Sequence, residues 1–184
     1  ALLAIVVDRT QPRITSITST LPSGLYRATQ VIPIAVNFSE PVVIGGTSAA
    51  LQIVLNNGKS FSVTPAANAM VVNYSYTVAV NDVATSDLTV TSIALTGTSP
   101  TLRDPAGNVA IIALPAGANL GDGKDIAIDA VAPPTPSMPD LLAADDSGTS
   151  PTDNVTNVAR PRFQATFAAG LVAGDVLQLL NGTT

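Results

Sequence analysis

Carboxylates are the side chains of this sequence with the clearest capacity for chemistry. The 184 residues include 12 Asp and a single Glu, Glu40, but no Cys, no His and only two Lys. Carboxylate and amide oxygens suit a hard cation that takes six to eight oxygen ligands, which describes calcium. Three groups of residues are therefore candidate calcium sites: a first group of Asp8, Glu40, Asp104 and Asn108, a second of Asp82, Asp87, Asp125 and Asp129, and a third of Asp145, Asp146, Asp153 and Asn154.

Charge density favours cation binding most strongly between residues 122 and 153. Seven Asp fall in this segment against one base, Lys124, and so much like charge would repel itself without counter-ions. Gly148 would let the backbone turn tightly around an ion in the third group. The alternative role of each residue is a solvated turn, since Asp and Asn beside Gly and Pro commonly form turns and the chain has no EF-hand or glycine-rich nonapeptide pattern.

Short strands separated by turns must position these groups. The excess of Asp over Glu and the many Thr, Val, Ser, Gly and Pro residues favour strands and turns over helices. Alternating hydrophobicity predicts strands over 14–20, 31–38, 51–55, 71–80, 88–95, 109–114 and 126–129, with a hairpin turn at Asn56-Asn57-Gly58. Seven strands in about 120 residues predict an all-β fold, a Greek-key β-sandwich of immunoglobulin type. In that topology the first group lies at one pole and the second group at the other.

The chain repeats one motif at a domain-sized interval. The segment from Ile5 to Pro12 aligns with the segment from Ile126 to Pro133, so an apolar strand that ends in Asp and is followed four residues later by Pro recurs at an offset of 121. A proline-stiffened linker at this spacing indicates a junction between domains. We expect residues 1–8 to be the last strand of a preceding domain, 9–129 a complete domain, and 130–184 the beginning of a following one.

Several short segments carry a resemblance when they are taken in order. They are FSEPV at 38–42, YTV at 76–78, DPAGN at 104–108, and Ile128-Asp129 with Pro133. Together they resemble the bacterial immunoglobulin-like, or cadherin-like, repeats of large surface adhesins of the RTX and biofilm type. Residues 145–157, followed by RPRF at 160–163, resemble a second variety of these repeats. The linkers differ from the usual Asp-Thr-Thr-Ala-Pro of the family, although the position of proline is kept.

This resemblance implies a non-catalytic extender on a bacterial cell surface or in a secreted protein. Its partners would be neighbouring repeats of the same chain, as tandem sandwiches, with self-association in filaments or biofilm as a further expectation. Calcium at each junction would link adjacent domains and stiffen the chain. Extracellular modules bind calcium with dissociation constants of about 10⁻⁴ to 10⁻³ M, so such sites would fill only after export.

Other functions fit the composition less well. An enzyme would need a nucleophile or base without His or Cys, so we expect no catalysis. A ligand-binding sandwich of a secreted protein would need exposed aromatics, but there is no Trp, and we expect Phe38, Tyr74, Tyr76 and Phe163 to lie in cores. The net charge of −5 opposes nucleic-acid binding, and residues 1–7 are too short to cross a membrane. A subunit of a filament, sheath or surface layer, assembled laterally or by strand donation, is the main structural alternative.

Overall fold

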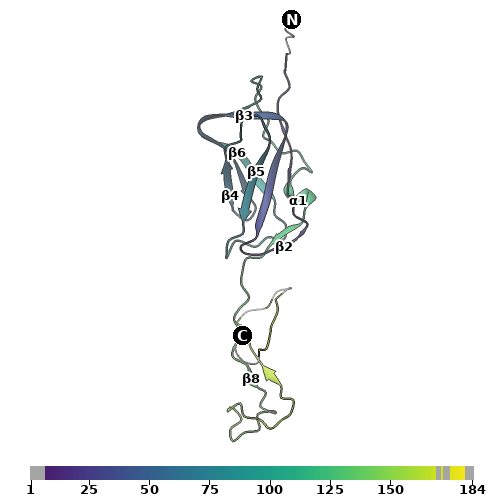
Figure 1. The fold of residues 1–184 in the computed structure, drawn as a ribbon, viewed down its shortest axis with the longest axis vertical. Coiled ribbons are helices and arrows are strands. Elements are labelled where there is room, and N and C mark those ends of the chain that lie inside the picture. The colour runs from purple at the N-terminus through teal and green to yellow at the C-terminus, as the bar shows by residue number, and fades with distance from the viewer. Residues whose placement is uncertain (1–6, 169–170, 172–174, 181–184) are drawn as a thin grey trace. The chain divides into compact units, whose positions relative to one another are not determined.

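A computed structural model describes residues 7–168, 171 and 175–180, and the fold is all-β in these residues (Figure 1). The chain divides into two compact units, residues 1–131 and 132–184. Unit 1 contains β1 (Ile14–Thr18), β2 (Gly24–Tyr26), β3 (Val31–Leu55), β4 (Ser60–Val63), β5 (Ala69–Thr77), β6 (Val90–Arg103), the short helix α1 (Leu120–Gly123) and β7 (Ile126–Ile128). Unit 2 contains the antiparallel pair β8 (Asp140–Leu141) and β9 (Phe163–Gln164). Of the strand expected at 1–8, residues 1–6 lie outside the described residues, and Val7 and Asp8 belong to no strand.

The long strand β3 supplies both layers of unit 1. Its first half, up to Val42, pairs with β1 and β5, and its second half, from Val43, pairs with β4 and β6. The sequence predicted two strands, 31–38 and 51–55, separated by a loop. The loop prediction was wrong, because residues 39–50 belong to the same strand, which passes from one set of partners to the other with a register shift between Asn37 and Val42. The result is a β-sandwich-like arrangement of mainly antiparallel strands.

Other predicted boundaries differ from the observed ones. The Asn56-Asn57-Gly58 turn is confirmed as the hairpin that joins β3 and β4, with Gly58 at φ +82°. The segment 109–114 forms only isolated bridges, one of Val109 to β6 and one of Ile111 to the residue before β1. It donates from Ala110 to the Leu102 carbonyl and from Ile111 to the Pro12 carbonyl, so it spans two neighbours instead of following one. β2, β4 and α1 were not predicted.

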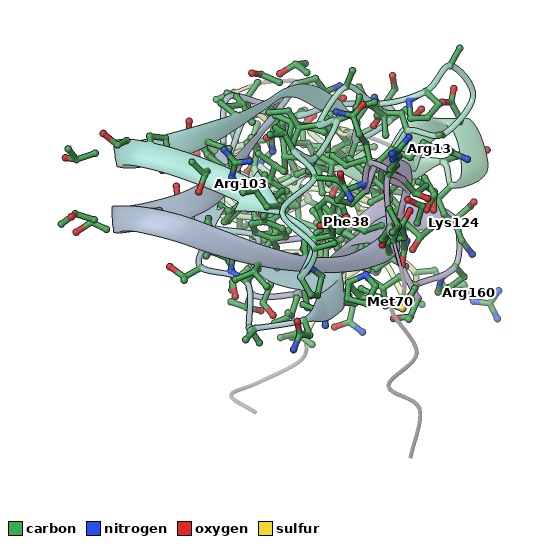
Figure 2. All side chains as sticks on the ribbon, turned by 90° about the horizontal axis from the view of Figure 1, so that it is seen from above. Arg13, Phe38, Met70, Arg103, Lys124 and Arg160 are labelled. Carbon is green, nitrogen blue, oxygen red and sulfur yellow. The ribbon has the colours of Figure 1, made fainter. Side chains whose placement is uncertain are left out.

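Inward-facing residues of β1, β3, β5 and β6 fill the core of unit 1. Phe38, Tyr74 and Tyr76 are buried there, which confirms their predicted role, and Phe38 lies between the strands in Figure 2. Phe163 in unit 2 is 50% exposed, so its predicted place in a core was wrong. It lines an open groove of about 440 Å³ together with Pro136, Pro139 and several leucines of residues 177–180. Such a groove shields only part of the ring.

Two identical tripeptides face each other where β3 pairs with β6. Gly46-Thr47-Ser48 and Gly97-Thr98-Ser99 both place glycine and serine at positive φ, +114° and +53° in the first and +108° and +49° in the second. Thr47 lies opposite Thr98, and the register shifts on both sides of this pair. The two tripeptides therefore form a reciprocal pair of bulges, in which each glycine lies against the backbone carbonyls of the other tripeptide.

Candidate metal centre

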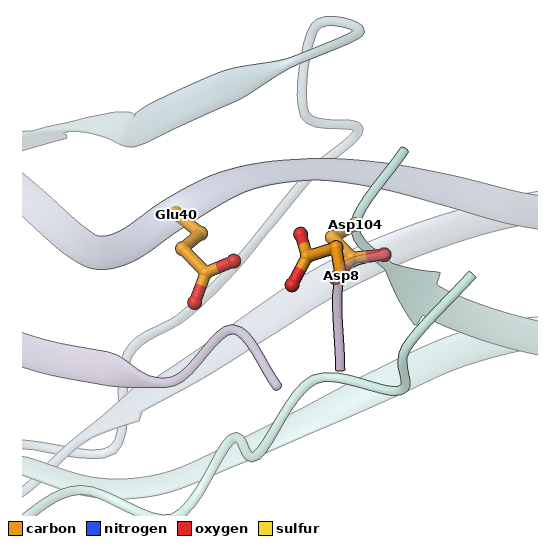
Figure 3. A group of neighbouring side chains, drawn as sticks. All are labelled: Asp8, Glu40 and Asp104. Atoms are coloured by element: carbon orange, nitrogen blue, oxygen red, sulfur yellow. The ribbon is translucent and has the colours of Figure 1, made fainter. Parts of the chain in front are cut away.

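Three carboxylates of the first predicted group converge in unit 1. One carboxylate oxygen from each of Asp8, Glu40 and Asp104 lies within 4.8 Å of the others (Figure 3). Asp8 precedes β1, Glu40 lies at the middle of β3 where the strand changes partners, and Asp104 follows the last residue of β6. The three side chains are thus separated widely in sequence and brought together by strand topology.

The DPAGN loop after β6 holds Asp104 in place. Asn108 donates from its backbone N–H to Asp104 Oδ1 (2.8 Å) and from its side-chain Nδ2 to Asp104 Oδ2 (2.7 Å). The same Nδ2 lies 3.3 Å from the Asp8 carbonyl oxygen, so Asn108 also connects the loop to the incoming chain. Asn108 was predicted as an oxygen ligand, but its side-chain nitrogen is what contacts the group. Its role in the structure is to orient Asp104.

The three carboxylates differ in burial. Asp104 is 4% exposed, Glu40 is half-buried and Asp8 is exposed. Burial alone would raise the pKa of Asp104, but hydrogen bonds from Asn108 and from backbone N–H groups of the loop outweigh it and hold that pKa below its usual value. In the part of the chain that the structure describes, no ion pair reaches these three residues. Three adjacent negative charges without a basic partner favour a bound cation.

This pKa shift predicts acid sensitivity that depends on Asp104. Because the pKa is lower in the folded than in the unfolded chain, ionised Asp104 stabilises unit 1 above about pH 4, and this stabilisation is lost as pH falls through the folded pKa. In chelator, Asp104→Asn should therefore flatten the decline of the urea midpoint below about pH 4. Asp125→Asn, at an exposed position, serves as the control. Equal acid sensitivity in the Asp104→Asn variant and the wild type would contradict the prediction.

The four residues of the second predicted group do not form one site among the described residues. Asp125 is exposed, and Asp129 accepts a hydrogen bond from the Val131 N–H. Asp87 lies against α1, where a Cβ at Gly121 would come within 2.6 Å of its Oδ2. Asp87 Oδ1 is buried without a hydrogen-bond partner among the described residues. The expected four-residue cluster is not assembled.

Asp82, the remaining member, belongs to a buried polar network. It is 5% exposed and forms an ion pair with Lys59 (2.5 Å). Its other oxygen accepts hydrogen bonds from the Tyr76 hydroxyl (2.7 Å) and the Ala79 N–H (2.9 Å), and Asn57 donates to the same hydroxyl. Burial would raise the pKa of Asp82, but the bonds from Lys59, Ala79 and Tyr76 lower it further than burial raises it. The Lys59 ammonium thus supplies, at Asp82, the positive charge that we expected calcium to supply.

The third predicted group divides into two parts. Asp145 accepts hydrogen bonds from the Arg162 side chain at 2.8 and 3.0 Å and from the Arg162 backbone N–H, and these lower the pKa of Asp145 to about 2. The Asn154 side-chain oxygen accepts from the Leu141 N–H. These two residues therefore hold the loop of unit 2 together, whereas Asp146 and Asp153 have no basic partner among the described residues.

The repeated motif has the same local hydrogen bond at both of its occurrences. Asp8 Oδ1 accepts from the Thr10 N–H (2.9 Å), and Asp129 Oδ1 accepts from the Val131 N–H (3.2 Å). In each case the carboxylate stabilises the turn that leads to the linker proline. The two occurrences of the motif, 121 residues apart, therefore share the same side-chain-to-backbone hydrogen bond.

Comparisons with protein-family models, with curated proteins and with solved structures gave no match. The helical residues that the structure describes include no segment long and apolar enough to cross a membrane. The likeness to adhesin repeats thus rests on the sequence motifs alone.

Proposed function

We propose that this chain is an extracellular, non-catalytic extender segment of a repetitive bacterial surface protein, built from immunoglobulin-like Greek-key sandwiches and stiffened by calcium at domain junctions. The observation that carries the proposal is the convergence of Asp8, Glu40 and Asp104. Asp8 belongs to the repeated linker motif, whereas Glu40 and Asp104 belong to the body of unit 1. A cation bound by all three would fix the incoming linker to the domain that follows it.

The local geometry supports this role for the linker. The hydrogen bond from Asn108 Nδ2 to the Asp8 carbonyl already ties the linker to the loop after β6. Asp8 Oδ1 accepts one hydrogen bond from Thr10. Calcium would replace a set of repelling charges with a cross-link, and the affinity expected of extracellular modules, about 10⁻⁴ to 10⁻³ M, matches an environment rich in calcium.

A filament, sheath or surface-layer subunit is the second candidate, favoured by the edge strand β5. Among the described strands, β5 pairs only with β3. Its nine residues include no charged residue and no proline, which are the features that usually protect an edge from pairing with another chain. Lateral assembly through this edge would build a polymer from the same sandwiches. No comparable feature of the described residues favours a ligand-binding module.

Small-angle scattering of the intact chain tests both candidates. An extender predicts a monomer whose distribution of lengths narrows when chelator is replaced by about 5 mM calcium, because the ion fixes the linker that precedes β1 to unit 1. Asp8→Asn should remove this response, and Asp125→Asn should retain it. A calcium-independent length would contradict the extender. An apparent molecular mass that increases with protein concentration would instead support the filament subunit.

A further inference from the structure

The last strand of unit 1 is held on both of its sides. On one side β7 pairs in parallel with β2, and the Gly24 N–H and the Tyr26 carbonyl bond to the residues just before and just after β7, at 2.9 and 3.0 Å. On the other side, Thr85 exchanges two backbone hydrogen bonds with Ile128, at 2.8 and 3.1 Å. A strand in this position cannot be peeled away from a single neighbour, as an edge strand can.

Burial also fixes β7 in the core of unit 1. Ile126 and Ile128 are 0% and 1% exposed, and the buried Leu88 donates from its N–H to the Ile126 carbonyl (2.7 Å). The chain just after β7 is fixed too, since Ala130 is buried and its carbonyl accepts from the Asn81 N–H (3.1 Å). Withdrawal of β7 must therefore break hydrogen bonds on both sides and expose apolar side chains at the same time.

Tension on unit 1 would act first on its terminal strands. The chain enters the unit before β1 and leaves it after β7, at the opposite end (Figure 1). β1 is also held on both sides, by β3 and by bonds from Ile14 to the Ile111 carbonyl and from Ile17 to the Ala118 carbonyl. However, β1 has five residues and β7 has three. Because the same tension acts at both ends, the shorter β7 is the strand that releases first.

We infer that β7 is the force-bearing strand of unit 1, and that its release sets the tension at which the unit opens, independently of calcium. The three carboxylates that could hold a cation lie where the chain enters the unit. At the exit, hydrogen bonds and burial hold β7, and nearby Asp82 is paired with Lys59. The inference rests on the proposed extender function for its biological setting, since a chain that links two bodies carries tension.

Constant-force measurements on the intact chain test this inference. The sequence has no Cys, so a Cys added at each end gives unique attachment points. Unit 1 has more than twice as many residues as unit 2, so its opening is recognised by an extension of about 400 Å. Ile128→Ala should raise the unfolding rate of unit 1 at fixed tension by about tenfold or more. Ile53→Ala truncates an equally buried isoleucine of β3 and should raise the rate less than about threefold, because that part of the core is intact when β7 leaves.

The outcomes separate this inference from the proposed junction site. Replacing about 5 mM calcium with chelator should change the wild-type unfolding rate by less than about twofold. A larger increase in chelator would overturn the inference, because the entry would then yield first, but it would agree with a cation at the junction. Equal acceleration by Ile128→Ala and Ile53→Ala would also overturn it, because the whole core would then yield together. If Ile128→Ala does not fold, Ile128→Val and Ile53→Val provide the same contrast at a smaller size. Loss of the calcium response in scattering would contradict the junction site alone.

Discussion

Replacing Asp82 with alanine is expected to lower the free energy of unfolding of unit 1 by about 3 kcal/mol. The substitution removes the ion pair with Lys59 and the hydrogen bonds from Tyr76 and Ala79. It also leaves the Tyr76 hydroxyl, in a residue 1% exposed, without its acceptor. The loss stays near 3 kcal/mol because the Lys59 side chain is 40% exposed and its ammonium group can be hydrated once the partner is gone.

Urea unfolding in chelator measures this effect without contribution from calcium. Asp125→Ala is the matched control, because Asp125 is exposed and should change stability by less than about 0.5 kcal/mol. If Asp82→Ala were as harmless as the control, the network would be peripheral to stability. The assignment of Asp82 to structure rather than to a metal site would then lose its basis.

Replacing Gly97 with alanine is expected to lower stability by about 3 to 4 kcal/mol. Position 97 has φ +108°, where a side chain is strained. A Cβ there would also lie 2.7 Å from the Ser48 carbonyl oxygen and 2.8 Å from that of Thr47. Since both obstacles are backbone atoms, the paired bulges of β3 and β6 would have to move apart.

Gly58→Ala separates the two causes of this loss. Gly58 also has a positive φ, +82°, but no atom lies within 4 Å of the Cβ that alanine would add. Its substitution should therefore lower stability by about 1 kcal/mol, from backbone strain alone. The melting temperatures of the two variants provide the comparison. Equal losses at positions 58 and 97 would show that the close approach of the two tripeptides contributes nothing.

Local patterns were sufficient for the all-β class and for several elements. The alternation of Val31 to Phe38 and the Asn-Gly turn act within a few residues, so their structures follow from sequence. The continuous strand β3 could not be predicted from local sequence, because Pro41 and the Gly45-Gly46 pair are typical turn residues. Here they serve a strand that changes partners. The segment 109–114 was mistaken for a regular strand for a related reason, since its pattern does not reveal that its hydrogen bonds go to two different neighbours.

The candidate sites could also be predicted only in part, because they depend on contacts between residues distant in sequence. Topology placed Asp8, Glu40 and Asp104 at one pole, and the structure brings these three together. The sequence could not show that Lys59 would reach Asp82, because the two residues lie in different turns. Nor could it show that Arg162 would bind Asp145 and leave Asp146 without a basic partner among the described residues. Counting carboxylates finds acidic regions, but the positions of a few basic side chains decide which carboxylates are paired within the chain.

Thermal unfolding of the intact chain in calcium and in chelator, at fixed ionic strength, tests the central claim most directly. With a dissociation constant of about 10⁻⁴ to 10⁻³ M, about 5 mM calcium should stabilise unit 1 by about 1 to 2 kcal/mol and raise its melting temperature by roughly 4 to 8 °C. Asp104→Asn should remove most of this rise, and Asp125→Asn should preserve it. An unchanged melting temperature in the wild type, or an equal rise in Asp104→Asn, would contradict a calcium site at Asp8, Glu40 and Asp104.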